Sequence, residues 1–597
     1  MCGIVGYVGK KNCIPILIDG LKNLEYRGYD SAGIAFLDDN QIKVIKKQGR
    51  LVNLIENVDN KYYSNLGIGH TRWATHGVAN EVNAHPHHVG DITLIHNGII
   101  ENYEELRNEL INHGYQIDTE NDTKIACAYI DYLYKNNHDM LKTLSMLKEK
   151  FKGSYALGIL VNGSDKLYAI RKDSPLIIGV SNDGNYIASD VFAILNETNK
   201  YIVLDNNEVV ILDNKVNVYN NGVLVDKKIL TFNHKADEIT KNGYSHFMLK
   251  EIHEQDNLAK KLIDMYLENK DTIINKMPCF DKYEKIDIVA CGSAYHAGMI
   301  GKSLIEEYGD IPVSVNLASE YRYKKLFLND KTLVIAISQS GETADTLASV
   351  NIAKQNNADT LGIVNVALSS IARVCDNVLY TNAGPEIAVA TTKAYSMQVL
   401  MLTLIALNIG VSKNLIDKDK LDYIINNYRL LPSKIKEEIN KNYSDIAKQI
   451  YNKNDIFFIG RNVDYALAME GSLKLKEISY LHAESYAAGE LKHGTISLIE
   501  EGTPVIAIVT DDKIYEKTIS NIKEVKARGA NVILITNDKL DVNGDFYDSK
   551  IVVSNLHNLV NSLITIVPLQ LIAYEVAKMK NLDIDKPRNL AKSVTVE

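Results

Sequence analysis

The first 235 residues consist of short apolar runs separated by Gly, Asn and Asp turns, a pattern that predicts β-strands. Helices fit fewer segments, among them one from residue 139 to 148 whose apolar residues recur near a 3.6-residue period. The expected strands are Ile4–Val8, Gly33–Leu37, Ile42–Lys46, Gly67–Thr71, Thr93–Asn97, Tyr155–Val161, Leu167–Arg171 and Tyr186–Ser189, and the expected helices are Cys13–Asn23, Tyr103–His113, Asp122–Lys135 and Asp139–Lys148. This half is therefore predicted to be a strand-rich α+β sandwich with helices.

An internal repeat begins beyond residue 280, after a helical run from about residue 247 to 268. Apolar strands ending in Gly or a turn recur with an offset near 170 residues: 286–292 as 454–460, 333–337 as 505–509, and 358–364 as 530–535. Buried strands alternating with helices indicate two parallel, doubly wound α/β units. We predict a first domain over residues 2–235 and two α/β domains over 276–415 and 449–588. A linker and helix over 236–275 and a helical connection over 416–448 join them, and a tail follows over 589–597.

Composition narrows the class of protein. The chain has 597 residues, of which 46% are hydrophobic and 24% charged, as in a soluble protein of several domains. The most apolar stretches, 399–411 and 562–577, are interrupted by polar residues and predict buried helices rather than membrane spans. The net charge of −9 argues against nucleic acid and anionic membranes as partners. Six cysteines without a Cys-x-x-Cys pair, and no signal-like start, favour a reducing cytoplasm.

The N-terminus carries candidate chemistry. If Met1 is removed, Cys2 has a free thiol beside a free α-amine, which titrates near ~8 and can take the thiol proton. Polar clusters lie at 72–77, 96–98 and 121–123. Each has an ordinary alternative: Arg72 as a surface charge, Asn97-Gly98 as a turn, and Asp122 as a helix N-cap. The run His85-Pro86-His87-His88 lacks evident Cys or carboxylate partners, so we interpret it as structural rather than as a metal site.

In the second half, three hydroxyl residues follow one buried strand. Ser338-Gln339-Ser340-Gly341-Glu342-Thr343 leads into a helix, and hydroxyls with free N–H groups at a helix N-terminus bind anions. The second repeat has Thr510-Asp511-Asp512-Lys513 at the equivalent place, where the carboxylates would repel phosphate. The repeat therefore predicts one phosphate site. Glu470, Lys474 and Glu477 share one helix face at i, i+4 and i+7, which suits acid–base chemistry or, alternatively, a simple salt-bridge ladder.

The N-terminal half resembles the class II glutamine amidotransferases, which have the Ntn-hydrolase fold. The matching segments are 2–6, 26–33, 69–77, 83–86 and 96–99. The resemblance implies that Cys2 attacks the glutamine side-chain amide, with its own amine as base and with Asn97 and the Gly98 N–H as the oxyanion hole. Trp73 would be the gate for ammonia. The glutamine pocket would consist of Arg72 on the α-carboxylate, Asp122 on the α-ammonium, and Thr75, His76 and Gly77 along its wall.

The C-terminal half resembles tandem sugar-isomerase (SIS) modules with flavodoxin-like parallel sheets, and in particular the glucosamine-6-phosphate synthase family. The segments that match the family are 291–298, 338–343, 386–393, 470–477, 482–484, 489–494 and 587–597. The resemblance implies a Schiff base on Lys592, proton transfer by Glu477, and ring opening by His493, which could reach a neighbouring subunit, with Lys474 in support. The implied sugar-phosphate contacts are Ser293, Ser338, Gln339, Ser340, Thr343, Val389, Glu470 and Ala591. Ala294 stands where the family usually has Ser, so one sugar-contacting hydroxyl is missing.

Together these resemblances imply an enzyme that makes glucosamine 6-phosphate and glutamate from fructose 6-phosphate and glutamine, the first step toward UDP-N-acetylglucosamine. No metal, nucleotide or organic cofactor is expected, and SIS modules commonly pair, so a homodimer is expected. One alternative keeps the amidotransferase half with a different acceptor, although no nucleotide-binding loop is visible. Another is a non-enzymatic sugar-phosphate sensor, which would not need Lys592, Glu477 and His493. A deacylating Ntn hydrolase would leave the C-terminal half unexplained.

Overall fold

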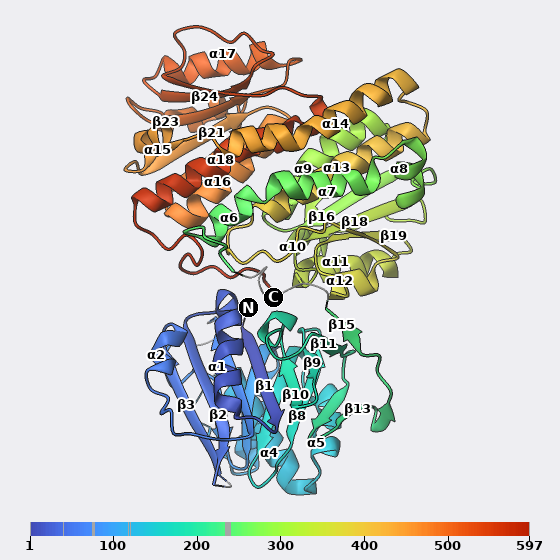
Figure 1. The fold of residues 1–597 in the computed structure, drawn as a ribbon, viewed down its shortest axis with the longest axis vertical. Coiled ribbons are helices and arrows are strands. Elements are labelled where there is room, and N and C mark those ends of the chain that lie inside the picture. The colour runs from blue at the N-terminus through green and yellow to red at the C-terminus, as the bar shows by residue number, and fades with distance from the viewer. Residues whose placement is uncertain are drawn as a thin grey trace. The chain divides into compact units, whose positions relative to one another are not determined.

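The computed structural model in Figure 1 describes residues 2–39, 41–73, 78–117, 119, 121–232 and 240–595. The chain forms two compact units. The first comprises residues 1–239 together with 591–597, and the second comprises residues 240–590. The last seven residues therefore belong to the first unit, although the segment directly before them belongs to the second.

The described part of the first unit contains two antiparallel sheets. In spatial order the larger sheet has β15 (Leu230–Thr231), β11 (Lys200–Val203), β9 (Ile177–Val180), β10 (Gly184–Ala188), β1 (Gly3–Gly9), β4 (Leu66–Arg72), β2 (Ser31–Asp38) and β3 (Gln41–Gln48). The other has β14 (Val223–Val225), β13 (Val216–Asn220), β12 (Val209–Leu212), β8 (Leu167–Lys172), β7 (Gly153–Val161), β6 (Ile92–Ile100) and β5 (His87–Val89). The helices are α1 (Cys13–Leu24), α2 (Leu51–Ile55), α3 (Tyr103–Asn112), α4 (Asp122–Asn137) and α5 (Met140–Lys150), with short 3-10 turns at Glu25–Arg27 and Val191–Ala193.

The first unit is a four-layer sandwich because its central strands are apolar on both faces. Along β1, Ile4 and Val8 pack between the two sheets, whereas Val5 and Tyr7 pack under α1 and α2. The outer face of the second sheet is covered by α3, α4 and α5. Alternating side chains of one strand thus fill two separate cores. The predicted α+β Ntn-type sandwich is confirmed, and its predicted strands and helices are all present.

The second unit contains two five-stranded parallel sheets of the same order, 2-1-3-4-5, the flavodoxin-like arrangement. The strands of the first sheet are β17 (Val313–Leu317), β16 (Lys285–Ala290), β18 (Thr332–Ser338), β19 (Asp359–Val364) and β20 (Asn377–Tyr380). Those of the second are β22 (His482–Ala487), β21 (Asp455–Gly460), β23 (Pro504–Val509), β24 (Asn531–Asn537) and β25 (Ser549–Val553). The internal repeat of the sequence is therefore a repeat of the fold, as predicted.

Helices surround both parallel sheets. Most of them share one large core, and the others pack in a smaller core on each sheet. The helices are α6 (Phe247–His253), α7 (Gln255–Tyr266), α8 (Lys270–Lys276), α9 (Ser293–Gly309), α10 (Ala318–Tyr321), α11 (Ala344–Gln355), α12 (Ser370–Val374), α13 (Lys393–Ser412), α14 (Lys418–Ile439), α15 (Ser444–Ile450), α16 (Val463–Ser479), α17 (Tyr515–Lys526) and α18 (Asn558–Met579), with 3-10 turns at Leu491–His493 and Thr495–Leu498. Figure 1 shows α16 beside α18, and α9 packs closely on α13 because Gly301 leaves room for Leu402. The predicted helical run over 247–268 is two helices, α6 and α7, that meet at Glu254.

Two described helices, α13 and α18, are long and apolar enough to cross a membrane by length and composition alone. Within the second unit, however, all of the apolar window of α13 and 89% of that of α18 are buried. These are the two apolar stretches that the sequence predicted as buried helices. They form the centre of the core shared by both parallel sheets.

Candidate functional site

The pairing of β1 with β4 places Cys2 beside Trp73. Gly3 is opposite Thr71 in this register, so the residues just beyond the strand ends meet. The Trp73 N–H donates to Cys2 Sγ at 3.4 Å, and the thiol lies 3.6 Å from the Trp73 carbonyl oxygen. Burial raises the pKa of the Cys2 thiol, and the Trp73 N–H and the Arg72 charge only partly oppose this. The thiol is therefore protonated at neutral pH and needs a base to become a nucleophile.

Asn97 and Gly98 lie within strand β6, so the alternative interpretation of these residues as a turn is wrong. The Asn97 side-chain NH2 donates to the Cys2 carbonyl oxygen at 3.0 Å. Gly98 has φ of +126°, and a Cβ there would lie 2.0 Å from the Ser154 carbonyl oxygen. Only glycine fits this backbone. The strand thus brings an amide donor and a distorted glycine to the nucleophile.

A buried cation, Arg72, lies near Cys2, and a buried anion, Asp122, lies near that cation. Arg72 is only 4% exposed, so its interpretation as a surface charge is wrong. Burial lowers the pKa of Arg72, which the nearby Cys2 and Asp122 oppose. Asp122 is the first residue of α4 and not its N-cap, which is Asn121. Its carboxylate instead accepts the N–H of Ile100 at 3.1 Å. The other three predicted pocket residues, Thr75, His76 and Gly77, lie outside the described residues.

Four buried histidines lie behind this site, and sequence reasoning gave none of them a catalytic role. Burial lowers the pKa of His70, His85, His87 and His96, so all four are neutral at physiological pH. His85 stacks on His70 with ring centroids 4.2 Å apart and contacts His87 edge-on. His70 Nε2 lies 3.1 Å from the Asn97 side-chain oxygen. In the sequence, His70 could be noticed because it is a polar residue within the predicted strand Gly67–Thr71.

In the second unit, the hydroxyl-rich loop lies at the carboxyl end of β18, as predicted. Ser338 Oγ accepts the Gly341 N–H at 3.0 Å and lies 2.9 Å from Thr343 Oγ1, and Ser340 Oγ accepts the Glu342 N–H at 3.1 Å. The Gln339 carbonyl oxygen accepts from the loop after β19. Because the loop leads directly into α11, its hydroxyls surround a helix N-terminus, an arrangement suited to a phosphate.

The equivalent place in the second repeat already contains an anion. Asp464, at the start of α16, is buried and accepts the Thr510 N–H at 2.7 Å as well as the Thr510 hydroxyl. Burial raises the pKa of Asp464 to about 6. Asp512 pairs with Lys539. The strand end that would receive a phosphate in this repeat is therefore occupied by a carboxylate of the chain itself.

Helices α9 and α16 bring together the charged face predicted on α16 and polar residues of α9. Glu470 is fully buried and accepts from Ser293 Oγ at 2.9 Å, and its second oxygen lies 2.8 Å from His296 Nδ1. Lys474 lies 3.5 Å from Glu470 and 2.5 Å from Glu477. Burial lowers the pKa of Lys474, but these two carboxylates outweigh it and raise the pKa overall. Sequence reasoning missed His296, which no local pattern distinguishes from other helix residues.

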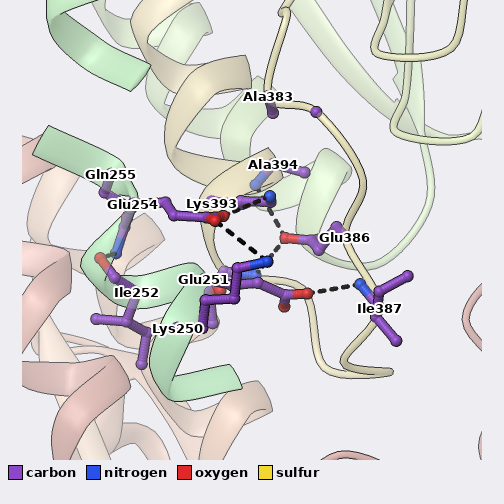
Figure 2. A network of polar contacts seen from close by, with 12 residues as sticks. Lys250, Glu251, Ile252, Glu254, Gln255, Ala383, Glu386, Ile387, Lys393 and Ala394 are labelled. Atoms are coloured by element: carbon purple, nitrogen blue, oxygen red, sulfur yellow. Dashed lines mark hydrogen bonds and ion pairs between the residues drawn. The ribbon is translucent and has the colours of Figure 1, made fainter. Parts of the chain in front are cut away.

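The loop over residues 386–394, which contains Val389, is held by buried carboxylates (Figure 2). Glu386 Oε1 accepts the N–H groups of Thr392 and Ala394, both at 3.0 Å. Glu251 of α6 accepts the N–H of Ile387 at 2.5 Å and that of Ala388 at 3.2 Å. The Lys393 ammonium donates to Glu254, between α6 and α7, at 2.7 Å. The linker helices thus fix the shape of this loop.

The remaining residues that the sequence singled out are His493, Ala591, Lys592 and Ala294. His493 is exposed on a 3-10 turn after β22. Ala591 and Lys592 belong to the tail of the first compact unit, whereas Ser338, Val389 and Glu477 belong to the second. Ala294 is partly buried against the core of the second unit, where its methyl group packs among apolar neighbours.

Comparison with known proteins gives consistent matches in both units. A glutamine amidotransferase domain model matches residues 70–196, and an SIS domain model matches residues 280–408 and 449–579. Among solved structures, the C-terminal domain of glucosamine-fructose-6-phosphate aminotransferase from Francisella tularensis is 38% identical, with a TM-score of 0.55, and covers 58% of this chain and 99% of that one.

Full-length relatives extend the match to the whole chain. Glutamine–fructose-6-phosphate aminotransferases (isomerizing) from Clostridium acetobutylicum and Caldanaerobacter subterraneus are 48% and 47% identical, and each alignment covers 100% of both chains. Identity at this level over both units, with the Cys2 site in one and the Ser338 loop in the other, shows that the chain belongs to the family of isomerizing glutamine–fructose-6-phosphate aminotransferases.

Proposed function

We propose that the chain transfers the amide nitrogen of glutamine to fructose 6-phosphate and isomerises the product to glucosamine 6-phosphate. Hydrolysis of glutamine consumes one water and releases ammonia and glutamate. Condensation of ammonia with the ketose carbonyl returns the water. The observation that carries the proposal is that one chain holds both the Cys2–Asn97–Arg72 group and a hydroxyl loop with an acid–base helix face.

In the first unit, Cys2 is the nucleophile and its α-amine, freed by removal of Met1, is the base. The NH2 of Asn97 and the N–H of Gly98 receive the developing oxyanion. A zwitterionic substrate needs one fixed cation and one fixed anion, which the buried Arg72 and Asp122 supply. Thr75, His76 and Gly77 are further candidates for binding glutamine, on the family resemblance alone. Trp73, whose N–H contacts the Cys2 sulfur, gates the passage of ammonia.

In the second unit, the hydroxyls of Ser338, Ser340 and Thr343 bind the sugar phosphate together with Gln339. Glu477 moves the proton between C1 and C2 of the sugar, and Lys474, 2.5 Å away, holds its charge. Glu470 is fully buried with its oxygens on Ser293 and His296, so it acts by positioning Ser293 rather than by direct contact. Val389 contacts the sugar. In the tail that belongs to the first unit, Ala591 contacts the sugar and Lys592 forms the Schiff base with its carbonyl carbon, releasing water, before ammonia displaces the lysine amine.

His493 assists opening of the sugar ring. Its exposure on the 3-10 turn supports a role in the site of a neighbouring subunit, because such a side chain can enter a second copy of the chain. We therefore propose a homodimer. The six cysteines without a Cys-x-x-Cys pair support a location in the cytoplasm, and the proposed substrates are L-glutamine and D-fructose 6-phosphate.

The test is product analysis of purified protein supplied with glutamine and fructose 6-phosphate. We expect glucosamine 6-phosphate and glutamate in equal amounts. The Cys2→Ala variant should lose glutamine-dependent synthesis by about 10³-fold or more, because the nucleophile is gone, while ammonium still supports synthesis.

Two results would contradict the proposal. Hydrolysis of glutamine without any amino sugar would mean that the acceptor is wrong, and Ala294, where the family has a hydroxyl, would be the first position to restore as Ala294→Ser. Unchanged glutamine-dependent synthesis by Cys2→Ala would mean that Cys2 is not the nucleophile. Mass spectrometry of the intact protein shows in the same sample whether Met1 has been removed.

A further inference from the structure

We propose that His70 is a positioning residue that fixes the orientation of the Asn97 amide, so that its NH2 and not its oxygen faces the Cys2 site. This inference rests on the proposed glutaminase function of the first unit. His70 lies on β4 of one sheet and Asn97 on β6 of the other, and the two side chains meet between the sheets.

The surrounding atoms determine the tautomer of His70. Its Nε2 lies 3.0 Å from the His96 carbonyl oxygen and 3.1 Å from Asn97 Oδ1. A backbone carbonyl can only accept a hydrogen bond, so Nε2 must carry the proton. The other ring nitrogen, Nδ1, is buried and has no hydrogen-bond partner among the described residues, which fits an unprotonated nitrogen.

The tautomer in turn determines the amide orientation. An Nε2–H beside Asn97 requires the Asn97 oxygen on that side, because the NH2 group there would bring two donors together. The NH2 group is then directed to Cys2, whose carbonyl oxygen it reaches at 3.0 Å. One of its two hydrogens makes this bond, and the other remains to donate to the oxygen of a bound amide. Rotation of the amide by 180° would instead present an oxygen to a developing negative charge.

Burial keeps His70 in the form that this role needs. The ring is fully buried and stacked on His85, and desolvation lowers the pKa of His70 to about 3. It therefore remains a neutral donor with one N–H across the physiological range. The amide orientation should accordingly not change with pH near neutrality.

The test compares His70→Gln with His70→Asn. Counting bonds from the backbone, the amide nitrogen of Gln lies as far out as Nε2 of His, whereas that of Asn corresponds to Nδ1 and cannot reach Asn97. Glutamine hydrolysis is measured without any sugar. We expect His70→Asn to lower kcat by about 10²-fold, as for removal of one oxyanion donor, and His70→Gln to recover most of this loss. His87→Asn is the matched control, because His87 is another buried histidine of the same cluster, contacts His85 edge-on and has no hydrogen bond to Asn97.

A second readout separates positioning from general damage. The Cys2 sulfur adds to the carbonyl carbon of glutamate γ-semialdehyde: the C=O π bond opens, the thiol proton passes to the Cys2 amine, and the former carbonyl oxygen carries the negative charge as in the tetrahedral intermediate. Glutamate binds without this bond. His70→Asn should weaken semialdehyde binding by the same factor as kcat and leave glutamate binding and ammonium-dependent synthesis unchanged. Equal activity of His70→Asn and His87→Asn, or a loss confined to KM and glutamate binding, would overturn the inference. No glutamine hydrolysis by the unmodified protein would instead overturn the proposed function.

Discussion

At the scale of single residues, Asp464 shows how the burial of a carboxyl group makes the stability of the fold depend on pH. Its oxygens accept the N–H and hydroxyl of Thr510, but the loss of hydration outweighs these bonds and raises its pKa from 3.8 to about 6. Between these two values the folded protein holds a proton that the unfolded chain has released. Stability therefore falls as pH rises through this window, and the penalty is complete above pH 6.

We predict that Asp464→Asn, which removes this charge, stabilises the second unit relative to the unmodified protein at pH 8 but not at pH 4. A shift of about 2 pH units corresponds to roughly 3 kcal/mol between these extremes. Urea unfolding at both pH values measures it, with the exposed Asp545→Asn as control. A stability difference that does not change with pH would show that Asp464 has no raised pKa in the folded protein.

At the scale of elements, helices α6 and α7 hold the loop that carries Val389. The Glu251 carboxylate accepts hydrogen bonds from two backbone N–H groups of this loop, and the Lys393 ammonium donates to Glu254. All of these groups are within the second unit, and the loop also donates the Val389 N–H to the Asp585 carbonyl at 3.0 Å. The helices that follow the linker therefore shape a proposed sugar-binding loop.

We predict that Glu251→Leu raises the KM for fructose 6-phosphate by about 10-fold or more, because it leaves two N–H groups without their acceptor. Glu251→Gln, which keeps one acceptor oxygen, should have a smaller effect. Glutamine hydrolysis without sugar should not change, and Glu268→Leu, at an exposed position beyond α7, is the matched control. A parallel loss of glutaminase activity would mean that Glu251 stabilises the whole protein rather than the loop.

At the scale of the whole molecule, the two SIS repeats share a fold but differ at their strand ends. The first offers the hydroxyls of Ser338, Ser340 and Thr343, and the second has its equivalent end bonded to Asp464. A phosphate cannot replace a carboxylate that already uses the Thr510 N–H and hydroxyl without breaking both bonds. Duplication of the fold therefore does not duplicate the proposed site.

Calorimetry should accordingly find one fructose 6-phosphate site per chain. We expect Ser338→Ala to weaken binding by about 10-fold, the cost of one hydrogen bond to a charged group, and Thr510→Ala to leave the affinity unchanged. Two sites per chain, or equal effects of the two substitutions, would contradict the assignment of the phosphate to the first repeat alone.

Much of this molecule followed from the sequence because its determinants are local. Strands such as β1 and β6, the duplicated parallel units and the buried helices α13 and α18 are encoded by apolar periodicity over short windows. The Ser338 loop and the Glu470–Glu477 face depend on residues close together in the chain. Spacing alone was therefore enough to predict the loop and the shared helix face, but it left open whether that face serves acid–base chemistry or is a salt-bridge ladder.

Tertiary structure alone decided which of these residues meet. His70 and Asn97 lie on strands of different sheets, and Ser293 and His296 of α9 meet Glu470 of α16 from more than 170 residues away. The burial of Arg72, the role of Asn121 rather than Asp122 as helix cap, and the carboxylate at the end of β23 likewise became visible only in the fold. Such contacts arise from the packing of whole elements, and no local pattern of side chains encodes which faces will be brought together.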